Sequence, residues 1–142
     1  GADAFANCPA LNKIFYKAIN ATIDATAFTD TNVDIIELGS KVEVIPTYLC
    51  TANSNLVLMN VPASVKEIKP RAFAGCYNLK EVTFNAKKCT VVASDAFDYC
   101  HKLEQIVLTN KVEYIPANLF VKYGSSELEE ITIPEGMARL RG

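Results

Sequence analysis

The amino-acid sequence predicts an α/β repeat solenoid of about six turns, each about 23 residues long. Three features predict this class: an aromatic residue recurs at a nearly constant interval, an L-x-x-I-x-L segment follows it in each interval, and a V-x-x-I segment ends most intervals. One such turn cannot bury its apolar face alone, whereas stacked turns bury it together. With 142 residues, of which 50% are hydrophobic and 21% charged, the chain suits a single globular domain over residues 1–142.

The aromatic column sets the period of the repeat. Its members are Phe5, Phe28, Cys50, Phe73, Phe97 and Phe120. Successive members are 23, 22, 23, 24 and 23 residues apart, and Cys50 belongs to the column because IPTYLC aligns with IPANLF. Small and turn-forming residues such as Pro70, Gly75 and Asn78 surround the column, which predicts a short helical turn or a tight loop on this side of each turn.

The L-x-x-I-x-L segment predicts the sheet. It ends in period-2 alternation with β-branched residues, as in TFN, ITI and IVL, which is typical of a short strand with one buried face. We expect the strands of all six turns to stack as one parallel sheet, because all their pattern positions are apolar or aromatic. These positions are Leu11, Ile14 and Tyr16; Val33, Ile36 and Leu38; Leu56, Met59 and Val61; Leu79, Val82 and Phe84; Leu103, Ile106 and Leu108; and Leu128, Ile131 and Ile133.

A V-x-x-I segment completes the turn. It is formed by Val42 and Ile45, Val65 and Ile68, Val112 and Ile115, and less cleanly by Met137 and Leu140. Asn20 stands where the first turn should carry an apolar residue, so the first junction is the least regular in register. Pro62 and Pro134 follow predicted strands, at positions where a missing N–H is tolerated.

These columns resemble the BspA-type leucine-rich repeat family of bacterial surface proteins, whose units carry A-F-x-x-C-x-x-L followed by I-x-L-P and V-x-x-I. Residues 62–108 match most closely, and weaker matches extend over essentially the whole chain. The pattern departs from the family at Thr31, Asn53 and Tyr123, which stand where a cysteine is expected. The resemblance implies a right-handed, curved solenoid with its sheet on the concave face, an extracellular or cell-surface location, and a role in adhesion or protein binding. It carries over no catalytic residue.

The five cysteines follow the repeat columns. Cys8, Cys76 and Cys100 share one column, Cys50 replaces the aromatic residue, and Cys89 replaces the Val of V-x-x-I. All five positions call for a small or medium apolar group, so we interpret them as buried free thiols. A disulfide between Cys76 and Cys100 is the alternative, because residues of one column in consecutive turns lie about 5 Å apart.

No motif for catalysis, a metal or a cofactor is present. The only close pair of metal-binding residue types is Cys100 and His101, which would point in different directions, and His101 lies in the polar loop DYCHKL without a nucleophile nearby. The phosphate-binding loop, hydrolase elbow, zincin and EF-hand patterns are all missing. The sequence therefore indicates a protein that is not an enzyme.

Charge and termini limit the classes of partner. The net charge is −2, from 14 basic and 16 acidic residues spread along the chain, so we expect no nucleic acid partner. No run of 18 apolar residues occurs, so we expect no membrane insertion, and the N-terminal segment GADAFANCPAL lacks the regions of a signal peptide. We interpret Gly1 as a tag remnant and the chain as a fragment, in which the repeats continue or the ends associate with another copy.

The outward row of the predicted sheet is the candidate partner-binding surface, because its residues are free of core packing. Phe15, Ile35 and Leu58 should align diagonally over the first three turns, as an apolar strip beside carboxylates. The full candidate set is Phe15, Ile35, Glu37, Leu58, Asn60, Glu81 and Thr83. These residues suit a recognition module that binds a protein. A structural spacer that projects another domain is the alternative, since single exposed apolar residues are common on folded proteins.

Overall fold

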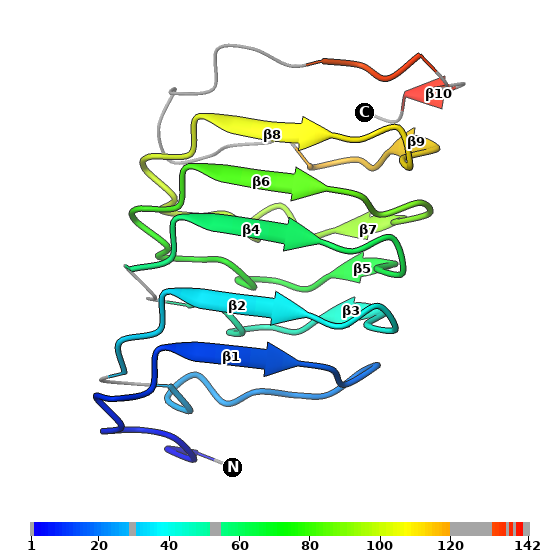
Figure 1. The fold of residues 1–142 in the computed structure, drawn as a ribbon. Helices are drawn as coiled ribbons and strands as arrows, with labels where there is room; N and C mark the ends of the chain where they lie inside the picture. The colour runs from blue at the N-terminus through cyan, green and yellow to red at the C-terminus, as the bar shows by residue number, and fades with distance from the viewer. Residues whose placement is uncertain are drawn as a thin grey trace.

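The computed structural model describes residues 2–28, 31–51, 55–119, 132–135, 137 and 139–140. Long strands run along one side of the stack: β1 (Lys13–Tyr16), β2 (Ile35–Leu38), β4 (Leu58–Val61), β6 (Glu81–Phe84) and β8 (Gln105–Leu108) (Figure 1). Two-residue strands lie on the other side: β3 (Val44–Ile45), β5 (Glu67–Ile68), β7 (Val91–Val92), β9 (Tyr114–Ile115) and β10 (Arg139–Leu140). The chain is a parallel-sheet β-solenoid.

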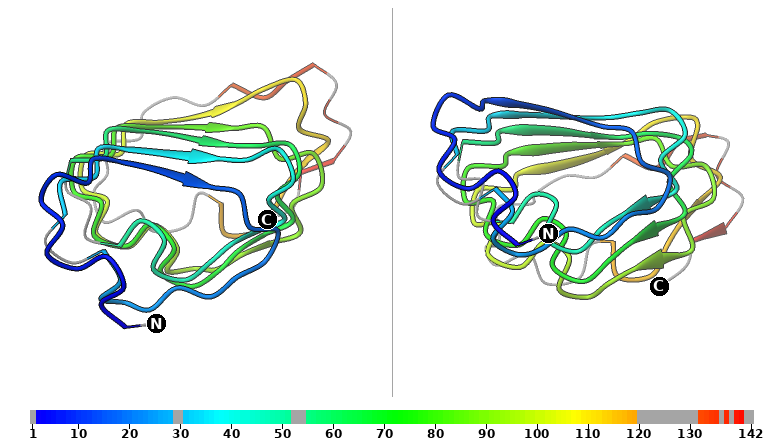
Figure 2. Two further views of the ribbon diagram at one scale, coloured as in Figure 1. Left: turned by 60° about the horizontal axis from the view of Figure 1, so that its bottom comes forward. Right: turned by 90° about the horizontal axis from the view of Figure 1, so that it is seen from below.

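The described residues form about four complete turns, each with one long and one short strand. The pairs are β2 with β3, β4 with β5, β6 with β7, and β8 with β9. Viewed along the stack, each turn passes through its long strand and returns along the other side of the coil (Figure 2). The prediction of six turns is not confirmed: the first turn has no short strand after β1, where Asn20 stands, and Leu128 and Ile131 of the sixth lie outside the described residues.

The strands pair in parallel and in the predicted register. Hydrogen-bonded ladders join β4, β6 and β8, and place Met59 opposite Val82 and Val82 opposite Ile106. Further parallel ladders join β1 to β2, β3 to β5 and β7, and β9 to β10. The expectation of parallel pairing is confirmed, but the described long strands form two ladders, β1 with β2 and β4 with β6 and β8, rather than one sheet.

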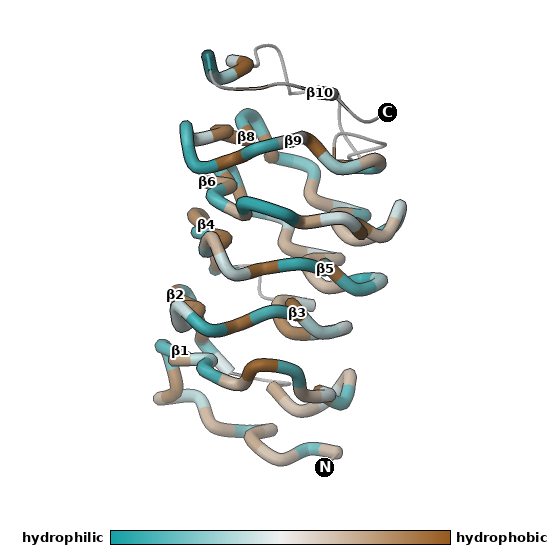
Figure 3. The backbone as a smooth tube through the Cα atoms, turned by 90° about the vertical axis from the view of Figure 1, so that its right-hand side faces the viewer, coloured by the Kyte–Doolittle hydropathy of each residue, from teal (hydrophilic) through white to brown (hydrophobic). Residues whose placement is uncertain are grey.

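The predicted columns form one continuous core. The residues with no exposed surface include Leu56, Leu79, Phe73 and Phe84. Hydrophobic and hydrophilic residues alternate along the coil (Figure 3), and the buried hydrophobic residues of successive turns form one cluster. Within the aromatic column, the rings of Phe73 and Phe97 stack with centroids 4.8 Å apart and an angle of 2° between their planes.

The α/β class is not confirmed, because the described residues contain no helix. Around the aromatic column the chain makes successive tight turns instead, as in the bonds from Cys76 N–H to Phe73 O and from Leu79 N–H to Cys76 O. Residues with positive φ interrupt the helical conformation at two positions, two residues before and two after the column. They are Asp3, Tyr48, Arg71 and Asn118 before it, and Asn7, Gly75 and Tyr99 after it.

Backbone hydrogen bonds between turns also oppose a helix. Phe73 N–H donates to Ala96 O at 2.8 Å and Gly75 N–H donates to Asp98 O at 2.9 Å, both in the following turn. An α-helix would need these N–H groups for bonds within its own segment. The turn segment is therefore held by its neighbours rather than by local helical bonds.

A seam separates the long strands of the second and third turns, whereas their short strands β3 and β5 are paired. Strands β2 and β4 lie side by side, but no ladder joins them among the described residues (Figure 1). In the other turns the residue after the long strand donates to the preceding turn, as Gly39 N–H does to Tyr16 O and Asn85 N–H to Val61 O. Pro62 occupies this position in the third turn and has no N–H to donate.

The cysteines are all free thiols, so the alternative of a Cys76–Cys100 disulfide is not seen. Four are buried, as expected, but the prediction is wrong for Cys8, which is exposed in the first turn. The buried column has a polar role as well: Cys76 Sγ donates to Cys50 O at 2.7 Å and Cys100 Sγ donates to Phe73 O at 3.2 Å. Each thiol thus satisfies a buried carbonyl of the preceding turn.

Removal of one aromatic ring should destabilise the whole stack. Phe73→Ala is expected to lower the free energy of unfolding by about 3–5 kcal/mol, because the ring is fully buried and stacked on Phe97. Urea denaturation is the measurement, and Phe15→Ala, which removes an exposed ring, serves as the matched control. A loss for Phe73→Ala no larger than that of the control would contradict the packing described here.

Burial of Cys89 should make stability depend on pH. Desolvation raises the pKa of the Cys89 thiol to about 12, although the nearby backbone of Val91 lowers it in part. The unfolded thiol ionises near its ordinary pKa of 9.0, so the folded state loses stability as pH rises from about 9 toward 12. We expect the free energy of unfolding, measured in urea from pH 8 to 11, to fall in the wild type. The fall should be steeper than in Cys89→Ala by about 1 kcal/mol per pH unit. Parallel pH curves would show that the thiol is not buried.

Candidate partner-binding surface

The outward side chains of the long strands form two columns. Strand alternation puts every second residue on the outer face, and the parallel register aligns these residues from turn to turn. The first column contains Lys13, Ile35, Leu58, Glu81 and Gln105. The second contains Phe15, Glu37, Asn60, Thr83 and Val107. We call these ten residues the strand face, and all seven predicted site residues lie on it.

Three large apolar residues of the strand face are exposed. The exposed fractions are 59% for Phe15, 44% for Ile35 and 64% for Leu58. Phe15 pairs with Glu37 rather than with Ile35, so the two apolar side chains are diagonal neighbours on adjacent strands. Leu58 begins β4 on the far side of the seam. These three residues are the apolar strip.

Charged groups border the apolar strip. Lys13 Nζ lies 3.2 Å from Glu37 Oε1 and 4.6 Å from the centroid of the Phe15 ring. Both charged side chains are solvent-exposed, so this ion pair adds little to stability. Its effect is local, since it places a cation over one side of the exposed ring.

The strand face becomes polar toward β6 and β8. Asn85 Nδ2 donates to Asn60 Oδ1 at 2.7 Å, and Thr109 Oγ1 donates to Asn85 Oδ1 at 2.8 Å. Glu81 and Thr83 are half-buried, in contrast with the exposed Leu58. The structure thus separates the candidate residues into an apolar group on β1, β2 and β4 and a polar group on β2, β4 and β6.

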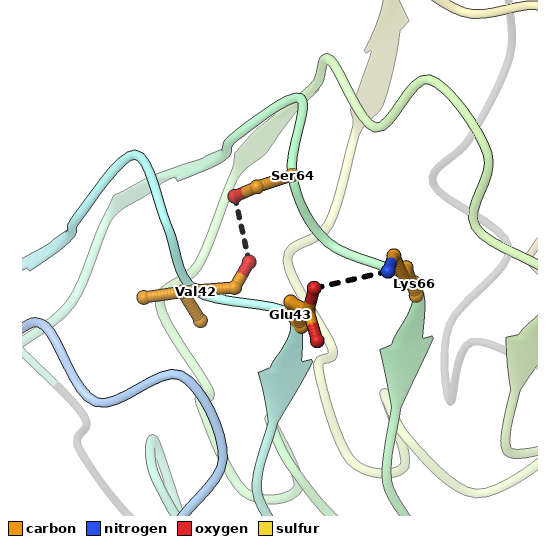
Figure 4. A network of polar contacts seen from close by, with 4 residues as sticks. All are labelled: Val42, Glu43, Ser64 and Lys66. Carbon is orange, nitrogen blue, oxygen red and sulfur yellow. Dashed lines mark hydrogen bonds and ion pairs between the residues drawn. The ribbon is translucent and has the colours of Figure 1, made fainter.

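The opposite side of the coil carries polar contacts that join consecutive turns. Ser64 Oγ donates to Val42 O at 2.6 Å, and Lys66 Nζ lies 2.9 Å from Glu43 Oε1 (Figure 4). Each contact links the loops that precede β3 and β5. These residues therefore help to hold neighbouring turns together.

No catalytic or metal centre is apparent in the described part of the chain. It contains no group of three or more histidine, cysteine, aspartate or glutamate residues that could hold a metal ion. It also contains no helix long and apolar enough to cross a membrane. His101 is exposed, and its ring centroid lies 5.7 Å from that of Tyr77 and 6.1 Å from that of Tyr99.

The sequence reasoning missed a hollow of about 380 Å³ beside the aromatic column. It is lined by Tyr48, Thr51, Arg71, Ala74, Gly75, Tyr77, Asp98 and Tyr99. The available signal was the recurrence of tyrosine around the core column in the third, fourth and fifth turns. Because those positions are not core positions, the core pattern alone did not select them.

Comparisons with known proteins agree with this architecture. The family model described as BspA type Leucine rich repeat region (6 copies) matches residues 1–89 and 21–141. The crystal structure of a leucine-rich repeat protein from Bacteroides ovatus ATCC 8483 superposes with a TM-score of 0.64 and 25% sequence identity. The match covers 99% of this chain and 42% of that chain, so this chain spans less than half of its length. No curated protein matches the sequence.

Proposed function

The chain belongs to the BspA-type leucine-rich repeat family, and on that premise we propose that it is a non-catalytic recognition module that binds a partner protein through the strand face. The repeat family supports a protein-interaction or structural repeat module. The observation that favours interaction is the exposure of Phe15, Ile35 and Leu58 on adjacent strands. Apolar and aromatic anchors with a charged or polar rim have the composition of a protein interface.

The rigidity of the sheet supports this proposal. The strip residues lie on strands whose other face is packed into the continuous core, so their backbone positions are set before any partner arrives. Binding then orders few groups, which lowers its entropic cost. The polar residues Asn60, Glu81 and Thr83 would border the contact and determine how the partner protein is aligned on the strand face.

The proposal includes adhesion at a bacterial cell surface and an extracellular location, which the family resemblance supports. It also includes a sixth turn formed around Leu128, Ile131 and Ile133, which the match over residues 21–141 supports. Association of this repeat domain with another copy belongs to the same proposal.

Substitution of the strip should weaken binding without unfolding the protein. We expect Leu58→Ala to reduce affinity for a bound protein by roughly fivefold or more, since interface energy concentrates in a few anchors. The measurement is surface plasmon resonance against a panel of purified extracellular-matrix and cell-surface proteins. Val91→Ala is the matched control, because Val91 is 49% exposed on β7, away from the strand face.

Two results would count against the proposal. Binding that is lost with Val91→Ala and retained with Leu58→Ala would place the contact on another side of the coil. The absence of any protein ligand in the panel would favour the structural spacer.

A further inference from the structure

A hollow on the outer side of the tight turns has the features of a ligand site. It lies apart from the strand face, at another part of the coil. Its volume is about 380 Å³, within the usual range for small-molecule sites. Tyrosines from three consecutive turns line it: Tyr48, Tyr77 and Tyr99. We call it the tyrosine hollow.

The repeat itself creates the hollow. Tyr48 and Arg71 occupy the position two residues before the aromatic column in neighbouring turns, and both have positive φ. Gly75 and Tyr99 occupy the position two residues after it. At this position the next turn carries the aromatic ring of Tyr99. Because Gly75 has no side chain, it leaves room beside the Tyr99 ring.

The aromatic walls are held in place. The rings of Tyr77 and His101 stack with an angle of 16° between their planes, and the ring of Tyr99 meets that of His101 at 70°. Tyr77 is 48% and Tyr99 61% exposed, so both rings still present surface to a ligand. His101 is a positioning residue here, since it contacts both rings but does not line the hollow.

The lining of the hollow carries one charge of each sign. Two groups of Arg71 contact the Asp95 carboxylate. The backbone N–H of Arg71 donates to Asp95 Oδ1 at 3.3 Å, and Arg71 Nε lies 3.7 Å from Asp95 Oδ2. The Asp98 carboxylate has no hydrogen-bond or ion-pair partner among the described residues, and the Thr51 hydroxyl donates to Arg71 O at 2.9 Å. Arg71 and Asp98 are the only charged groups of the lining, and together they offer a ligand both hydrogen-bond donors and acceptors.

We propose that the tyrosine hollow binds a neutral saccharide unit. The C–H faces of a sugar ring pack against aromatic rings, while its hydroxyls both donate and accept hydrogen bonds. The hollow supplies all three partners: exposed tyrosine rings, the Asp98 carboxylate as acceptor and the Arg71 guanidinium as donor. The Arg71 guanidinium would repel a basic peptide, and the Asp98 carboxylate would repel an acidic one.

The test uses the whole chain and named neutral probes. Isothermal titration calorimetry with lactose, chitobiose, methyl α-mannoside and methyl β-galactoside should reveal binding of at least one of them. Tyr99→Ala and Tyr77→Ala should each weaken that binding by about tenfold, because each removes one aromatic wall. Thermal unfolding midpoints should stay close to that of the wild type, because both rings are exposed.

Phe15→Ala is the matched control, since it removes an exposed ring from the strand face and should leave saccharide binding unchanged. The proposal is overturned if none of the four probes binds, if binding survives the double substitution of Tyr77 and Tyr99 by alanine, or if only a lysine-rich or glutamate-rich peptide binds. Its failure would leave the strand-face proposal standing, because that proposal depends on Leu58→Ala and on protein ligands.

Discussion

Every turn of this protein depends on the turns beside it, because hydrogen bonds and apolar contacts between turns replace those that a helix or a wide sheet would supply. Lys80 N–H donates to Val57 O at 2.8 Å and Glu104 N–H donates to Lys80 O at 2.9 Å, so the long strands are tied in series. On the other side of the coil, the N–H of Phe73 bonds forward to the next turn. Stability is thus a sum of nearest-neighbour contacts.

The same dependence explains the seam between the long strands of the second and third turns. Pro62 removes the N–H that other turns use at this position, and Cys50 replaces the ring that would continue the aromatic column. Phe5 stacks on Phe28, and Phe73 stacks on Phe97. The aromatic column therefore consists of two stacked pairs, one before Cys50 in the chain and one after it. Ile35 and Leu58, two of the three exposed apolar residues of the strand face, lie on the strands that border this seam.

The sequence predicted the structural features that recur in every turn and missed those that belong to single residues. Periodic columns located all five long strands and the buried Phe73, because each column has one environment in every turn. They could not reveal that the turn segment avoids a helix, since this follows from single residues with positive φ such as Arg71 and Tyr99. The tyrosine hollow escaped for a related reason: its lining comes from different positions of neighbouring turns, and only the stack brings them together.

Amide hydrogen exchange tests the dependence of each turn on its neighbour most directly. The N–H groups of Asp34, Lys80 and Glu104 occupy equivalent positions and donate to the preceding turn, whereas that of Val57, at the same position beside the seam, has no such partner among the described residues. Measured by NMR and corrected for intrinsic rates, Val57 should exchange at least about tenfold faster than the other three. Equal protection at all four positions would contradict the account.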